Sequence, residues 1–80
     1  MKLSLIEIKE NYTVWENKFW KIQKYKEFRW VLEIVHKKTG RTTTAVINAY
    51  KGRIDYTEFT PPEHIKKKVE HYFNIMKILP

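Results

Sequence analysis

The chain has 80 residues, of which 42% are hydrophobic and 15% aromatic, and its 16 Lys and Arg against 9 Asp and Glu leave a net charge of +7. This length and composition predict one small folded domain spanning residues 1–80 and exclude a disordered chain. The absence of cysteine excludes disulfides and thiolate metal sites, and residues 1–20 contain no continuous apolar run. We therefore expect no signal peptide, no membrane span and a cytoplasmic location.

The first third of the chain is rich in strand-forming residues. Residues 3–8 are apolar and predict a first strand. Residues 12–22 predict further strand, with a turn or bulge near Glu16, Asn17 and Lys18. Residues 24–27 are polar and predict a connection.

The next segment predicts three strands joined by two tight turns. Residues 28–36 and 41–50 form the central hairpin, and residues 53–59 form the third strand of a meander. Gly40 and Gly52 are the only glycines, and each falls in a predicted turn. Glycine adopts a positive φ without steric cost, which is what such turns require.

A helix is predicted after these strands. Thr60 is the expected N-cap, Pro61 suits the first turn, and Glu63 completes a capping box. The helix is expected to end near Leu79. Its apolar side holds Ile65, Val69, Tyr72, Phe73 and Met76. Its polar side holds Lys66, Lys67, Glu70, Asn74 and Lys77. The predicted fold is therefore α+β: a small antiparallel meander sheet of four or five strands with one C-terminal amphipathic helix packed on one face.

The length of the central turn decides which side chains share a face of the sheet. If Lys38, Thr39 and Gly40 form a three-residue loop, Lys37 pairs with Arg41. One face then holds Val31, Val35, Ala45, Ile47 and Ala49 and, if Lys51 and Gly52 form a two-residue loop, also Ile54 and Tyr56. The other holds Phe28, Trp30, Leu32, Ile34, Thr44, Val46, Asn48, Tyr50, Asp55, Thr57 and Phe59. The alanines predict that the helix packs on the first face, although a one-residue slip would exchange the faces.

Catalytic and metal-binding arrangements are not evident in the sequence. His64 and His71 are two helical turns apart, about 10 Å, which is too far for two ligands of one metal ion. His36 stands beside two lysines, Ser4 has no adjacent base, and no glycine-rich phosphate loop exists. We expect no enzyme activity, no metal and no cofactor.

The segment from Ile47 to Ile54, with Asn48, Ala49 and Gly52, resembles the second half of a PepSY-type hairpin. That resemblance implies an inhibitory or binding module. Asn48 stands where the family has an aspartate, and the predicted helix follows the hairpin instead of preceding it. We do not assign the chain to this family.

The basic charge and the aromatic residues predict a nucleic-acid-binding surface. Aromatic rings on a sheet can stack on bases while Lys and Arg neutralise phosphates. The candidate residues are Phe28, Trp30 and Tyr50 as the platform, Lys37, Lys38 and Arg41 at one end of the sheet, and Lys51 and Arg53 at the other. Lysine outnumbers arginine thirteen to three, which favours weak sequence selectivity.

Two alternatives remain open at this point. The basic residues could form only a solvated surface. The aromatic face could instead be a protein-interaction surface that binds a partner or a second copy in a homodimer. A viral or plasmid accessory protein would suit either binding function.

Overall fold

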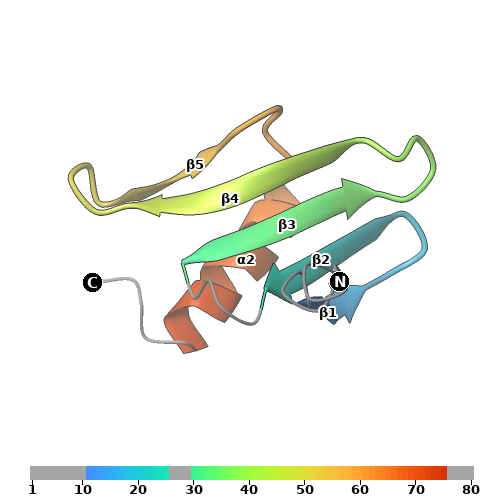
Figure 1. The fold of residues 1–80 in the computed structure, drawn as a ribbon, viewed down its shortest axis with the longest axis horizontal. Helices are drawn as coiled ribbons and strands as arrows, with labels where there is room; N and C mark the ends of the chain where they lie inside the picture. The colour runs from blue at the N-terminus through green and yellow to red at the C-terminus, as the bar shows by residue number, and fades with distance from the viewer. Residues whose placement is uncertain (1–10, 26–29, 76–80) are drawn as a thin grey trace, which may run out of the picture.

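The computed structural model describes residues 11–25 and 30–75, which form five strands and one helix (Figure 1). The strands are β1 Asn11–Glu16, β2 Trp20–Tyr25, β3 Val31–His36, β4 Thr42–Asn48 and β5 Arg53–Tyr56. They form one antiparallel sheet in the order β1-β2-β3-β4-β5, and helix α2, Glu63–Ile75, lies across one face. The predicted α+β fold is confirmed. The strand predicted at residues 3–8 lies outside the described residues.

The predicted break within residues 12–22 is a tight connection between β1 and β2. The Asn17 side-chain oxygen accepts hydrogen bonds from the backbone N–H groups of Phe19 and Trp20, at 2.9 and 2.7 Å. Asparagine commonly closes turns in this way, because its short side chain reaches backbone donors two or three residues ahead. Asn17 therefore explains why the chain reverses at this point.

A β-bulge distorts β1 beside the helix. Thr13 pairs with Gln23 and Trp15 with Ile22, so Val14 is the extra residue. The Val14 carbonyl accepts a 2.8 Å hydrogen bond from the Tyr72 hydroxyl of α2. The bulge thus provides the acceptor that joins the edge strand to the helix.

The β3–β4 hairpin has a register one residue away from the predicted register. Leu32 pairs with Ala45 and Ile34 with Thr43, and the His36 N–H donates to the Arg41 carbonyl at 2.8 Å. The loop therefore holds four residues instead of three, and the predicted pairing of Lys37 with Arg41 is wrong.

This one-residue shift reverses the predicted faces of β3. Leu32 and Ile34 are buried beneath α2, whereas Val31 and Val35 lie on the opposite face and are only partly buried. The helix needs a continuous apolar surface, and Leu32 and Ile34 provide more apolar area than the two valines.

The β4–β5 hairpin also differs in register from the prediction, but this difference leaves the predicted faces of β5 unchanged. Asn48 pairs with Arg53 and Ile47 with Ile54, so this loop also holds four residues instead of the predicted two. The pairing differs from the prediction by two positions, and side chains alternate with a period of two. Ile54 and Tyr56 consequently face the helix as predicted, but Ala49 is exposed in the turn, which corrects its predicted place under the helix.

Both turn glycines adopt the predicted positive φ, at +78° for Gly40 and +64° for Gly52. At each position an added Cβ would meet no atom within 4 Å. The requirement for glycine is therefore conformational and does not come from crowding.

Helix α2 begins later than predicted. The Pro62 carbonyl accepts the first helical hydrogen bond, from the Lys66 N–H at 3.0 Å, so Pro62 is the N-cap residue. The predicted capping box of Thr60 and Glu63 is wrong. The residue before a proline disfavours helical dihedral angles, so Pro62 disfavours a helix that begins at Pro61. Glu63 still lies in the first turn, where a carboxylate favours the helix dipole.

The core lies between α2 and the sheet. It consists of Ile22, Leu32, Ile34, Ala45, Ile65, Val69 and Phe73, all with no exposed surface. The three helix residues recur every four positions, as the predicted apolar stripe requires. Burying each large side chain contributes roughly 1.5–3 kcal/mol, so this layer supplies most of the stability. The predicted residues Met76, Lys77 and Leu79 lie outside the described residues.

Candidate functional site

The structure divides the predicted binding residues between the two ends of β4. Lys37, Lys38 and Arg41 lie at the β3–β4 hairpin, before β4 begins. Tyr50 and Lys51 lie in the β4–β5 turn, and Arg53 begins β5 at that same far end. Trp30 also lies at the far end, because its carbonyl accepts the Ile47 N–H at 3.2 Å. Phe28 lies outside the described residues.

The predicted aromatic platform on the open face of the sheet is not formed by the described residues. Trp30 precedes β3 and is 52% exposed, and Tyr50 projects fully into solvent from a turn. The open face carries Val31 paired with Val46, because the register of β3 is shifted. Lys37, Lys38 and Arg41 are instead next to a different set of aromatic residues.

Those aromatic residues line a cavity of about 200 Å³ at the β3–β4 hairpin end. Its lining residues are Trp20, His36, Thr39, Arg41 and Phe59. They come from β2, the β3–β4 hairpin and the segment between β5 and α2, so the cavity exists only in the folded chain.

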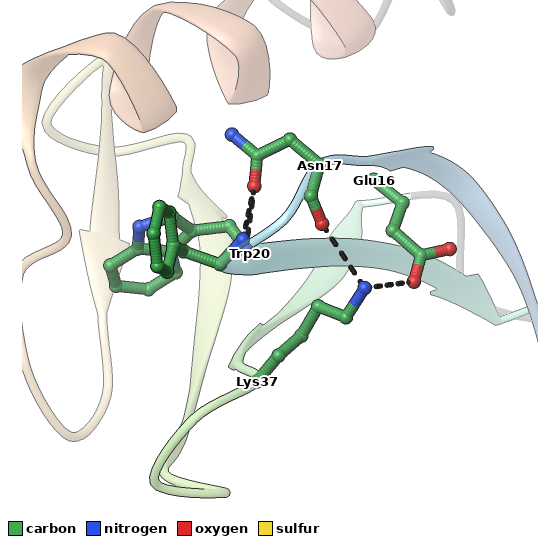
Figure 2. A network of polar contacts seen from close by, with 5 residues as sticks. Glu16, Asn17, Trp20 and Lys37 are labelled. Carbon is green, nitrogen blue, oxygen red and sulfur yellow. Dashed lines mark hydrogen bonds and ion pairs between the residues drawn. The ribbon is translucent and has the colours of Figure 1, made fainter.

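Trp20 forms one wall of this cavity and is fixed from two sides. Its backbone N–H donates to the Asn17 side chain at 2.7 Å (Figure 2). Its indole meets the His36 imidazole edge to face, with ring centroids 4.6 Å apart and planes inclined by 73°. This is a favoured aromatic geometry, and it limits rotation of both rings.

Phe59 forms a second wall, and a buried threonine fixes its position. The Thr43 hydroxyl oxygen accepts hydrogen bonds from the N–H groups of Glu58 and Phe59, at 3.0 and 3.2 Å. Thr43 has no exposed surface. The centroids of the Phe59 and Trp20 rings lie 6.3 Å apart, and the Arg41 guanidinium lies 4.7 Å from the centroid of the Phe59 ring. The sequence reasoning missed both Thr43 and Phe59 as contributors to a site.

The hairpin loop completes the cavity with polar groups. The Thr39 hydroxyl is 3.0 Å from His36 Nδ1, and it accepts the Arg41 backbone N–H at 3.2 Å. A threonine inside a four-residue turn thus orders the two residues that flank the turn.

A polar network connects the β1–β2 and β3–β4 loops beside the cavity (Figure 2). Lys37 Nζ forms an ion pair with Glu16 at 2.5 Å and donates to the Asn17 carbonyl at 3.1 Å. The hydrogen bond and positive charge of Lys37 lower the pKa of the Glu16 carboxyl. Because the pair is exposed, it contributes little to stability. It holds the two loops together and partly neutralises Lys37.

Two further lysines border the same end. Lys18, in the β1–β2 loop, places its ammonium 5.9 Å from the centre of the Phe19 ring, and Phe19 is 47% exposed. Lys38 is exposed in the β3–β4 loop. The hairpin end therefore combines cations with partly exposed aromatic rings.

The opposite end of β4 is electrostatically more balanced. Arg53 Nε forms a 3.0 Å ion pair with Asp55, and Asn48 donates to the same carboxylate at 2.8 Å. The Asn48 hydrogen bond is the main reason why the pKa of Asp55 is lowered. Arg53 is thus already paired with a carboxylate.

A cleft of about 430 Å³ lies between β5 and α2 and is lined by Arg53, Ile54, Tyr56, Lys66, Glu70 and Asn74, together with Gly52. Burial, reinforced by the charges of Glu70 and Glu63, raises the pKa of Tyr56 to about 12. The cleft mixes both charge signs, so it lacks the cationic character of the hairpin end.

Within residues 11–25 and 30–75, no three His, Asp or Glu side chains are grouped closely enough to hold a metal ion. In the same residues, no helix has the length and apolarity to cross a membrane.

Fold and site together define a small α+β protein: a five-stranded antiparallel meander, covered on one face by a helix, with an aromatic cavity and cations at one hairpin end. Comparison of the chain with protein-family models, curated proteins and solved structures found no match.

Proposed function

We propose that this chain is a small non-catalytic nucleic-acid-binding protein with weak sequence selectivity, and that it binds through the β3–β4 hairpin end. The observation that carries the proposal is an aromatic cavity at the hairpin end that also carries exposed lysines in two loops. Lysine and arginine neutralise phosphates, and aromatic rings stack on bases of any sequence.

The basic residues differ in how strongly they are expected to attract phosphates, because some of them are paired with carboxylates. Lys18, Lys38 and Arg41 are the principal candidates for phosphate contacts. Lys37 forms an ion pair with Glu16, and Arg53 forms one with Asp55. Each of these two cations therefore attracts a phosphate less strongly than an unpaired cation would. Lys51 and Tyr50 extend the candidate surface only if the nucleic acid spans both ends of β4. The preponderance of lysine supports backbone contacts more than base-specific ones.

Fluorescence anisotropy with a labelled oligonucleotide, titrated at several salt concentrations, tests this function. If about four phosphates are neutralised, log K should fall against log salt with a slope of roughly −3 on a single strand. Replacing Lys18 and Lys38 with glutamate should weaken binding by at least about tenfold, because each reversal turns attraction into repulsion.

The matched control replaces Lys67 and Lys68 with glutamate. These lysines are exposed on α2, and Lys68 approaches an aromatic ring, Trp15, at 5.3 Å, much as Lys18 approaches Phe19. Both double variants have the same net charge. Equal loss of affinity in the two variants would mean that only total charge matters, which contradicts a defined site at the hairpin end.

A protein-interaction function is favoured by a separate observation. Trp30 is 52% exposed and Tyr50 is fully exposed, both at the far end of β4. Large exposed aromatics often anchor protein interfaces. If the chain forms a homodimer through this region, Trp30→Ala should yield monomers by light scattering, and added salt should hardly weaken the association of the wild-type chain.

A further inference from the structure

We infer that the cavity between Trp20 and Phe59 accepts one unpaired nucleobase, so that the protein binds single-stranded nucleic acid in preference to duplex. This inference rests on the proposed nucleic-acid function and specifies its substrate class.

The size of the cavity favours a ligand of one or two fused rings. Its volume of about 200 Å³ is below the roughly 300–1,000 Å³ of pockets that hold drug-sized molecules. The Trp20 and Phe59 planes are inclined by 51°, so the rings form a corner and not a parallel slot. A base can stack on one ring while its edge contacts the other.

The remaining lining residues suit the edge of a base. Arg41 brings hydrogen-bond donors, the Thr39 hydroxyl can donate or accept, and His36 brings an imidazole. Nucleobases carry both donors and acceptors on their edges. Among the described residues, the cavity lining contains no carboxylate that would repel an electron-rich base.

Two lysines are close in the chain to lining residues of the cavity, since Lys18 comes two residues before Trp20 and Lys38 directly precedes Thr39. Lys18 belongs to the β1–β2 loop, whereas Lys38 belongs to the β3–β4 loop. The loops adjoin, because the Lys37 backbone N–H donates to the Phe19 carbonyl at 2.8 Å. A nucleic-acid strand with one base in the cavity could therefore continue along these adjoining loops and meet lysines of both.

Duplex nucleic acid cannot use such a cavity without disruption. Its bases are stacked and paired, so one would have to leave the helix, which costs a few kcal/mol of unstacking and unpairing. A single strand already has bases that can turn outward and stack on aromatic side chains. The fixed positions of both walls, through Asn17 and Thr43, reduce the ordering needed on binding.

The experiment compares a labelled oligothymidine with a duplex of equal length at one salt concentration. The wild-type chain should bind the single strand at least about tenfold more tightly. Phe59→Leu keeps an apolar side chain but removes the ring, and should weaken single-strand binding by about 5- to 150-fold. Its duplex affinity should remain unchanged. Thr39→Ala, at an exposed position, should weaken single-strand binding severalfold, because it removes a polar group of the cavity and the contacts that order His36 and Arg41.

Tyr50→Leu is the matched control, because it makes the same kind of change at a fully exposed aromatic residue at the far end of β4. Any loss of affinity that it causes should be equal for the single strand and the duplex, whereas the loss caused by Phe59→Leu should be confined to the single strand. Circular dichroism melting curves establish that each variant is folded, and the strand preference of the wild-type chain tests the inference without any variant.

The outcomes separate the inference from the function on which it rests. Equal affinity for single strand and duplex, with binding still lost on reversing Lys18 and Lys38, would overturn the base cavity and leave the nucleic-acid function standing. A loss confined to Tyr50→Leu would also overturn it, because binding would then lie at the far end. Affinity no greater than that of an unrelated protein of equal charge would overturn both.

Discussion

Thr43 is the residue on which the candidate site most depends. It is a polar residue at a fully buried position of β4, and its hydroxyl oxygen accepts hydrogen bonds from two backbone N–H groups of the segment between β5 and α2. Buried donors without acceptors are costly, so the hydroxyl is worth more than an average hydrogen bond. Thr43 also sets the position of Phe59, which links the packing of the core to the wall of the cavity.

Thr43→Val should lower the free energy of unfolding by about 1–3 kcal/mol, because valine has the same shape but cannot accept the two hydrogen bonds. Urea denaturation measures the change. Thr42→Val is the control, since Thr42 is on the opposite face and its hydroxyl makes only a long 3.4 Å contact with the Gly40 carbonyl. A similar small effect of both substitutions would show that the Thr43 hydroxyl is not needed to hold the segment.

At the scale of elements, the register of the β3–β4 hairpin decides which strand residues meet the helix. Ala45 pairs with Leu32 and belongs to the core together with Val69 and Phe73. Ala49 is four residues further along the chain, but it lies in an exposed turn, because β4 ends at Asn48. Two alanines that look equivalent in sequence therefore occupy opposite environments.

Ala45→Leu should lower the free energy of unfolding by about 1–3 kcal/mol, because the close-packed layer has no room for three more carbons. Ala49→Leu makes the same chemical change in the turn and should alter stability by no more than about 0.5 kcal/mol. Thermal melting of the two variants provides the comparison. A destabilising Ala49→Leu beside a neutral Ala45→Leu would contradict the register described here.

At the scale of the whole molecule, two tyrosines connect the sheet with the helix layer. Tyr72 of α2 donates to the Val14 carbonyl of β1, and Tyr56 of β5 lies near the acidic residues of α2. Burial raises the pKa of both phenols. The contacts between the sheet and the helix are therefore most favourable while both phenols are protonated.

This arrangement predicts a loss of stability in alkali. Between pH 10, the ordinary phenol pKa, and the raised pKa of Tyr56, about 12, the unfolded chain has released a proton that the folded chain retains. The unfolded state then binds fewer protons, so the free energy of unfolding falls as the pH rises through this window.

Tyr56→Phe should make stability less dependent on pH across that window, with the raised pKa of Tyr72 contributing to the remaining slope. Urea midpoints measured at about pH 9 and about pH 11 test this difference between the wild-type chain and the variant. Identical falls in both proteins would mean that Tyr56 ionises in the folded chain as readily as in the unfolded chain.

Local patterns in the sequence were enough to predict the elements of this fold. The two glycines located the hairpin turns, the spacing of Ile65, Val69 and Phe73 predicted the covered side of the helix, and alternation predicted the strands. Each of these signals depends on residues that are close together in the sequence. The start of α2 differs from the prediction, because the Thr60–Glu63 spacing fits a capping box whereas Pro62 disfavours helical dihedral angles at Pro61.

The tertiary structure alone decided the faces of β3 and the composition of the candidate site. Alternation with a period of two is equally satisfied by registers one residue apart, so the packing of Leu32 and Ile34 against α2 had to make the choice. The cavity combines Trp20, His36, Thr39, Arg41 and Phe59. These residues are separated by up to 39 positions in the chain, and only the pairing of strands and the Thr43 hydrogen bonds bring them together.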